Sequence, residues 1–236
     1  DSPRVEKLKK KFFYNQIKFM AIQEIKKKYL ETAMGMSWAV VQPVVYMLVI
    51  SFTVLINLSP NSSGGDFLVM LFAAHGCWLL ISSTLSDGAE IFSKNETLIS
   101  SIKFPVVILP VVSVLSKLFV HLAILIIVII FLTILGHPPS IYYLNFIYYW
   151  FTLIVFLTAL SFLFGCLNLY VPDFGKFIKS IMFPLFWATP VLYVPNAASE
   201  IYFQLFNPFY YFLSGYRDTF VHKVWFFDNM SYNFYI

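Results

Sequence analysis

Long apolar runs alternate with short polar connections along most of the chain. Five runs are each long enough to cross the hydrocarbon core of a bilayer, which takes about 20 mostly apolar residues. They cover residues 38–58, 67–86, 108–135, 146–170 and 177–195. Of the 236 residues, 59% are hydrophobic and 12% charged, which is more apolar surface than a soluble domain buries. The pattern predicts an all-α polytopic membrane protein, with residues 1–236 forming a single transmembrane domain and residues 38–195 its five spans.

Positive charge is concentrated in alternate connections between these runs. The first 28 residues hold nine Lys or Arg, and the second and fourth connections hold Lys94, Lys103 and Lys176. The connections at 59–66 and 136–145 hold none. Because cytoplasmic loops carry the excess of Lys and Arg, this asymmetry predicts a multi-pass protein whose N-terminus and even-numbered loops are cytoplasmic.

The N-terminal segment, residues 1–37, is basic but also carries apolar side chains at helical spacing. They form two stripes that are offset from one another, namely Phe13, Ile17 and Met20, and then Ile22, Ile25 and Tyr29. Such stripes predict one bent or two short amphipathic helices at the cytoplasmic membrane interface. The alternative is a solvated basic tail that only sets the topology.

The region after the fifth run is unsuited to a straight span. Prolines and aromatic residues crowd it, and interior prolines break helices, while free backbone groups are not tolerated against lipid. Ser199 could cap a short helix over residues 200–206, and Asn207 with Pro208 could start another. Residues 196–222 are therefore predicted to form two short re-entrant helices in the outer leaflet, with a surface loop as the alternative.

The sequence offers little catalytic chemistry. It has no P-loop, because Tyr170 and Phe177 occupy the places of the first glycine and the hydroxyl around the Gly175–Lys176 pair. The four histidines are scattered, without metal-ligand spacing. The five runs lack Asp and Glu, which argues against an ion-coupled transporter. No catalytic residue, no metal site and no cofactor are expected in this chain, and no nucleic-acid partner.

The first run carries one polar stripe. Gln42, Tyr46, Thr53 and Asn57 fall within about 60° of one another on a helix, and Trp38 extends the stripe at its cytoplasmic end. A stripe over the whole membrane depth favours a water-filled path, and we include Phe183 and Trp187 of the fifth run in this channel-lining hypothesis. The alternative is polar contacts that hold packed helices together. In the fourth run, Thr158, Ser161, Gly165 and Asn168 form a small-residue face that indicates close helix packing.

Six segments, taken together and in order, resemble one known family. They are KKKYLETAMGMSWAVVQP (26–43), GCW (76–78), NETLISSIKFPVVILP (95–110), PDFGKF (172–177), TPVLY (189–193) and FNPFYYFLSGYRDTF (206–220). The chain is similar to the permease subunit of ABC type-2 polysaccharide exporters, which move lipid-linked O-antigen, capsule or teichoic acid. One departure is Pro172, which stands before Asp173 where the family usually has Arg, so an ion-pair role for that position is not carried over.

The resemblance implies a six-span subunit, and residues 223–236 would begin its sixth span, which the sequence does not complete. Two copies would form a homodimer above two ABC ATPase subunits, which would bind the ATP and Mg²⁺. ATP hydrolysis would drive an undecaprenyl-type lipid-linked glycan from the cytoplasm across the bacterial inner membrane. Residues 196–222 would be the outer gate, with Glu200, Asn207, Pro208, Tyr210, Arg217 and Asp218 as its candidate residues.

The same resemblance makes the segment around residues 90–105 the element that couples to the ATPase. Its candidate residues are Glu90, Asn95, Glu96, Leu98, Ile99, Ile102, Phe104 and Pro105. Leu98, Ile99 and Ile102 would form an apolar ridge in a groove of the ATPase, with Glu90 and Glu96 against its basic rims. A helix capped near Asn95 and a proline-stiffened connector would transmit force. The alternative is a plain inter-span loop.

Three other functions are weighed against export of O-antigen. They are a permease for teichoic acid or capsule, an ABC type-2 exporter of small molecules, and a membrane-embedded glycan-modifying enzyme. The enzyme would need a convergent carboxylate or histidine site, which the spacing of these residues does not suggest. The sequence names neither the glycan nor a carbohydrate-binding domain on the ATPase.

Overall fold

The described part of the chain is built from helices. The computed structural model describes residues 14–24, 26, 35–57, 64–101, 105–193, 195 and 197–228. An N-terminal helix covers residues 14–24. The elements that follow are η1 (Gly35–Ser37), α2 (Trp38–Asn57), α3 (Gly64–Gly88), α4 (Ile91–Lys94), α5 (Glu96–Ser101), α6 (Ile108–Ile134), η2 (Ile141–Leu144), α7 (Asn145–Tyr170), α8 (Phe174–Ala188), α9 (Ala197–Phe206), α10 (Pro208–Arg217) and η3 (Asp218–His222), the last a π-helical turn. Within these ranges no strand occurs, which confirms the all-α fold class.

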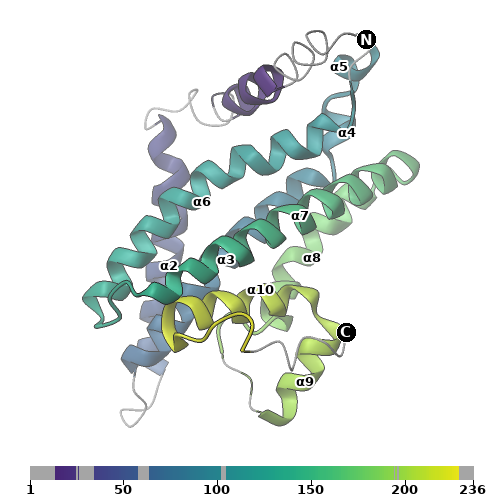
Figure 1. The fold of residues 1–236 in the computed structure, drawn as a ribbon. Coiled ribbons are helices and arrows are strands. Elements are labelled where there is room, and N and C mark those ends of the chain that lie inside the picture. Colours follow the sequence, from purple (N-terminus) through teal and green to yellow (C-terminus); the bar gives the residue numbers. More distant parts are fainter. Residues whose placement is uncertain are drawn as a thin grey trace.

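Helix α3 forms the centre of the bundle. In its most apolar stretch 78% of the residues are buried, against 33% in α6 and 22% in α7. Helices α6, α7, α8 and α10 pack around it, with α2 beside α3 and α6 (Figure 1). The fully buried Ile81 and Leu85 of α3 share the core with Leu153 and Leu157 of α7. The outer helices are therefore left with wide apolar faces, as expected of helices in lipid or against another subunit.

In the described residues, three helices are long and apolar enough to cross a membrane. They are Phe67–Gly88, Ile108–Ile134 and Ile141–Tyr170. Helix α2 has 20 residues, but α8 has only 15, which is about 22 Å of helix against a hydrocarbon core of about 30 Å. The fifth predicted run, 177–195, is thus not one continuous helix. Thr189 is extended because it precedes Pro190, and α8 ends at Ala188.

Local sequence signals set several helix ends. Gly136 at φ +91° ends α6, and the amides of Gly136 and His137 donate to the carbonyls of Thr133 and Leu132. Asn207 caps α10 by accepting a hydrogen bond from the Phe209 amide at 3.1 Å, with Pro208 at the first helical position. The two short helices expected within 196–222 are therefore present as α9 and α10, although α9 begins at Ala197, ahead of the predicted Ser199 cap, whose side chain lies outside the described residues.

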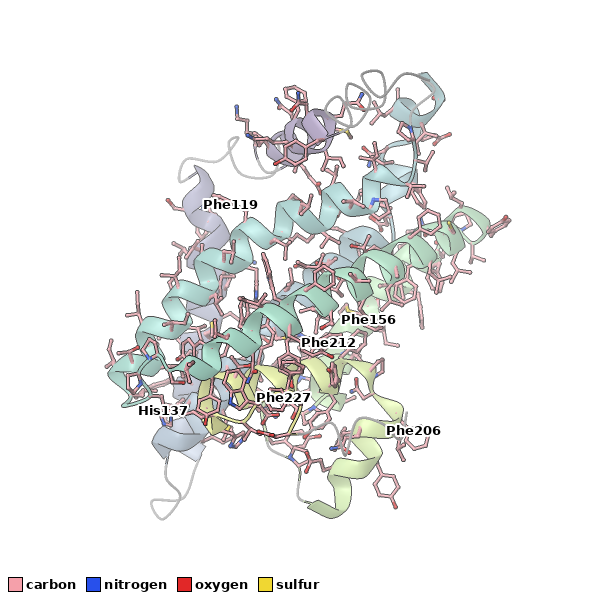
Figure 2. The ribbon with its side chains drawn as sticks, viewed as in Figure 1. Phe119, His137, Phe156, Phe206, Phe212 and Phe227 are labelled. Atoms are coloured by element: carbon pink, nitrogen blue, oxygen red, sulfur yellow. The ribbon has the colours of Figure 1, made fainter. Side chains whose placement is uncertain are left out.

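The bundle has two distinct ends. The N-terminal helix, α4 and α5 gather at one end, and α9 lies at the side of the molecule away from them (Figure 1). Phe156 of α7 and Phe212 of α10 lie next to each other inside the bundle, with ring centroids 5.3 Å apart, whereas Phe206 projects outward at the end of α9 (Figure 2). These two ends frame the sites predicted from the sequence.

Candidate functional site

The polar stripe of α2 lies between two different faces of that helix. Met47 and Ser51 face inward and are buried, about 100–140° around the helix from the stripe. Val45, Phe52 and Ile56 are exposed on the opposite flank. Trp38, Gln42, Tyr46 and Thr53 of the stripe are all exposed in the single chain, and the side chain of Asn57 lies outside the described residues. The stripe therefore borders both the bundle and an open face.

Tyr46 connects the stripe to an aromatic cluster between α2, α3, α8 and α10. Its ring stacks on His75 of α3 at 5.3 Å and meets Phe186 of α8 at 6.4 Å. Trp78, one turn along α3 from His75, contacts Phe186 and Phe209 at 6.0 and 6.2 Å. The Thr53 hydroxyl donates to the Val49 carbonyl of the same helix at 2.9 Å.

His75 is a residue whose place the sequence did not reveal. It is 1% exposed, and neither ring nitrogen has a hydrogen-bond partner among the described residues. The only signal near it was the GCW segment that follows, since Trp78 shares its cluster. Phe183 and Trp187 of α8 are 67% and 58% exposed, and the Trp187 ring meets Phe186 at 5.8 Å, so Trp187 lies at the exposed edge of the cluster.

The apolar ridge predicted on α5 faces its own chain. Leu98 and Ile99 are half-buried and pack on a small core of Ile91, Phe92 and Leu109, together with Met20 of the N-terminal helix. Exposed positions on α5 are instead polar, namely Glu96, Thr97 and Ser100. Because α5 docks an apolar face on α4 and α6, Leu98 and Ile99 contact their own chain, and the expectation that they insert into a partner's groove stays a prediction.

The remaining residues of this segment divide into two groups. Asn95 donates from its side chain to the Ile91 carbonyl at 2.7 Å, so it ends α4 instead of starting α5 by a side-chain cap. Pro105 is exposed. Ile102 and Phe104 lie outside the described residues, and their predicted role stays a prediction.

The small-residue face of α7 receives the turn between α3 and α4. Gly88 lies against Ser161, and Gly165 lies under Phe92, where an added Cβ would come within 2.9 Å of the ring. Asn168 accepts from the Gly175 amide at 2.6 Å and donates to the Ser93 hydroxyl at 3.2 Å. Close packing was the predicted role of this face, and these contacts confirm it.

Charged side chains surround the same turn. Glu90 accepts hydrogen bonds from Lys179 of α8 and pairs with Lys94 at 3.1 Å, and Asp87 pairs with Lys117 of α6 at 3.0 Å. Burial acts to raise the pKa of Glu90, but the hydrogen bonds and charges of Lys179 and Lys94 together lower the pKa below its ordinary value. Glu90 is therefore paired within its own chain, and the expectation that it meets a basic rim on a partner stays a prediction.

Two further charged side chains have partners within the chain. Lys117 of α6 is 9% exposed and donates to the Ser113 hydroxyl at 3.1 Å, in addition to its pair with Asp87. Asp173, in the turn before α8, pairs with Lys176 at 2.9 Å, and both side chains are largely exposed.

The predicted gate residues bind one another and the end of α8. Tyr210 donates to Glu200 at 2.9 Å, and Asn207 donates to the Thr189 hydroxyl at 2.9 Å. Pro208 starts α10. Arg217 and Asp218 are buried, and the Arg217 guanidinium donates to the carbonyls of the turn after α8, those of Pro190, Val191 and Tyr193. The structure thus brings these residues together around the end of α8.

The described residues hold no group of three or more His, Cys, Asp or Glu side chains that could bind a metal ion. Cys77 and Cys166 are both free thiols. The features that stand out are therefore aromatic, polar and ion-paired surfaces rather than a reactive centre.

Comparisons with known proteins agree with this picture. A family model described as "ABC-2 type transporter" matches residues 15–221. An O-antigen export system permease protein RfbA from Klebsiella pneumoniae is 21% identical over 218 residues, covering 89% of this chain and 82% of that protein. A protein of the same description from Myxococcus xanthus is 22% identical over 202 residues, covering 84% and 77%. The resemblance stated from the motifs is confirmed.

Proposed function

This chain belongs to the ABC-2 type transporter family, and from that premise we propose that it exports a lipid-linked polysaccharide of the O-antigen type across the bacterial inner membrane. The observation that carries the proposal is the similarity to O-antigen export permeases over 84–90% of the chain. As a permease component, the chain would supply the membrane path and not the energy. Two copies of an ABC ATPase would supply ATP hydrolysis, with Mg²⁺ bound there.

A homodimer is part of the proposal, because one chain leaves a candidate path open on one side. Tyr46, Phe183 and Trp187 are exposed on α2 and α8, and the neighbouring Gln42 and Thr53 are polar. A second copy facing this surface would enclose an aromatic and polar passage. Aromatic side chains stack on sugar rings while the polar groups hydrogen-bond to hydroxyls, so such a passage suits a glycan better than an ion.

The ATPase would act at the end that carries the N-terminal helix, α4 and α5. The polar side chains of Glu96, Thr97 and Ser100 are the surface of α5 available to it, since Leu98 and Ile99 face inward. At the other end, the unit of α9 and α10 would open to release the glycan to the periplasm. The N-terminus would be cytoplasmic, in accord with the basic residues before residue 29.

Reconstitution tests the proposal directly. The full-length permease is co-purified with its ATPase, placed in vesicles, and given a fluorescent undecaprenyl-linked O-antigen fragment on the ATPase side. We expect ATP-dependent appearance of the glycan on the opposite side, and none with an ATPase whose P-loop lysine is replaced. Transport of a small molecule or of teichoic acid in place of this glycan would refute the substrate, and glycan modification without movement would refute transport.

A further inference from the structure

An unbroken row of charges of alternating sign crosses the end of the bundle near α4. Among the described residues, Lys179 bonds Glu90, Glu90 pairs with Lys94 at 3.1 Å, and Lys94 pairs with Asp87 at 3.7 Å. The row continues from Asp87 to Lys117 at 3.0 Å and from Lys117 to Glu24 at 3.9 Å. We name these six side chains the charge row. Three acids face three bases, so the row is neutral as a whole.

Each member of the charge row belongs to a different part of the fold. Glu24 is on the N-terminal helix, Asp87 ends α3, Glu90 precedes α4, Lys94 is on α4, Lys117 is on α6 and Lys179 is on α8. Isolated exposed ion pairs contribute little, but this row is partly shielded, since the side chains of Lys117 and Glu90 are 10% and 18% exposed. The side chain of Lys94 is 50% exposed, which is the highest value in the charge row.

One end of the charge row reaches the opposite end of the molecule through α8. Lys179 lies in the first half of α8, and Arg217 holds the carbonyls of Pro190, Val191 and Tyr193 just beyond the last residue of that helix. Arg217 is the last residue of α10. A displacement of α8 therefore has a direct, hydrogen-bonded route to α10.

We propose that the charge row ties α4 to α8 and α6, so that a movement imposed on α4 is carried by Lys179 into α8 and through Arg217 to α10. Lys179 is then a positioning residue for transport. The inference rests on the proposed function, because it assumes that the ATPase displaces α4. Contiguous salt-bridge and hydrogen-bond networks of this kind are a physical basis for coupling distant elements.

Three variants of the full-length permease, each purified with its ATPase, test this role. Lys179→Met removes the contact to Glu90, and Lys179→Arg keeps the charge. Lys176→Met is the matched control, because Lys176 lies one turn away on α8 in an exposed pair with Asp173, outside the charge row. We expect Lys179→Met to hydrolyse ATP normally but to export roughly fivefold or more less glycan per ATP hydrolysed, a size typical of coupling between sites. Lys179→Arg and Lys176→Met should match the parent.

A distance measurement provides a readout that a loss of stability would not imitate. Spin labels at Val107 and Ser180, exposed residues at the start of α6 and on α8, are introduced after Cys77 and Cys166 are replaced by alanine. If the charge row makes these elements move together, the label separation stays the same with and without trapped nucleotide in the parent. It should shift or broaden on nucleotide binding in Lys179→Met.

The outcomes separate failure of this inference from failure of the proposed function. A parent complex that moves no glycan contradicts the proposed function, and the spin-label comparison then still reports on the charge row. A parent that exports glycan, with Lys179→Met exporting equally per ATP, overturns the inference alone. So does a Val107–Ser180 separation that changes with nucleotide in the parent.

Discussion

At the scale of single residues, Arg217 shows how a buried charge can stabilise an irregular turn. Pro190 cannot continue α8, so the carbonyls of Pro190, Val191 and Tyr193 lack helical partners. The guanidinium supplies several donors in a fixed plane, and it meets all three carbonyls at 2.8 to 3.1 Å. The sequence marked Arg217 as a gate residue, but it could not tell that the side chain faces inward, because its acceptors lie more than 20 residues away.

We predict that Arg217→Met lowers the free energy of unfolding of the detergent-solubilised protein by about 3 kcal/mol. Removing a charged donor that is bonded to several buried carbonyls leaves those groups unsatisfied. Arg217→Lys should lose about half as much, since one ammonium cannot reach all three carbonyls. Denaturant unfolding followed by circular dichroism measures both, with the exposed Lys223→Met as the control. Equal stability of Arg217→Met and the parent would contradict the described hydrogen bonds.

Substitutions at Leu98 and Thr97 test whether the apolar ridge of α5 packs on its own chain or faces a partner. Leu98 is half-buried against Ile91, Phe92 and Leu109, and Thr97 is exposed. Leu98→Asp should therefore destabilise the isolated permease by about 2 kcal/mol, because it loses apolar burial and places a charge in the contact. Thr97→Asp should leave its stability unchanged. Thermal unfolding of the permease without ATPase measures the stability of both variants. A Leu98→Asp variant as stable as the parent would indicate that the ridge faces a partner.

At the scale of elements, the contact between α3 and α7 depends on one glycine. A Cβ at Gly88 would overlap Ser161, whereas a Cβ at Gly76 of the same helix would meet only Val128 at 3.9 Å. Gly88→Ala should cost about 1–3 kcal/mol of stability through overpacking. Gly76→Ala should be neutral or gain up to about 1 kcal/mol from helix propensity. Parallel unfolding curves of the two variants check this, and the reverse order would refute the described approach of α3 to α7.

The stripe on α2 can be tested against the apolar flank of the same helix. We predict that Gln42→Leu and Thr53→Leu lower glycan export about fivefold with ATP hydrolysis retained, since each removes polar contacts worth about 1 kcal/mol along the path. Ile56→Leu, on the exposed apolar flank, is the control and should export normally. Transport in reconstituted vesicles is the measurement. Normal export by both stripe variants would assign the stripe to helix packing.

At the scale of the whole molecule, hydrophobic periodicity and helix-end signals in the sequence predicted the helices better than they predicted the tertiary contacts. The runs of apolar residues located α2, α3, α6 and α7, and Asn207 with Pro208 located the start of α10, because these signals are local. The length of α8 was overestimated, since its apolar residues continue past the break at Thr189. The hydrogen bond from Lys179 to Glu90 and the packing of Leu98 on a core shared with Met20 involve segments distant in sequence, and periodicity carries no information about them.

The membrane topology of the chain can be tested at the two ends of the bundle. The N-terminal helix and α5 share one end of the bundle, and the connection after α6 lies at the opposite side (Figure 1). Lys94 lies at the first end, whereas residues 136–145 hold no Lys or Arg, and an excess of these residues marks the cytoplasmic side. We therefore predict that the first end is cytoplasmic and the connection after α6 is external.

Single cysteines at Thr97 and Pro138, both exposed, report on the two sides after Cys77 and Cys166 are replaced. In intact spheroplasts an impermeant maleimide should label Pro138→Cys and not Thr97→Cys, and permeabilisation should make Thr97→Cys react as well. His137, beside Pro138, lies at the far end of the bundle from α4, so labelling there is insensitive to an ATPase bound at α5 (Figure 2). Labelling of Thr97→Cys in intact spheroplasts would invert the topology and would place α5 beyond the reach of a cytoplasmic ATPase.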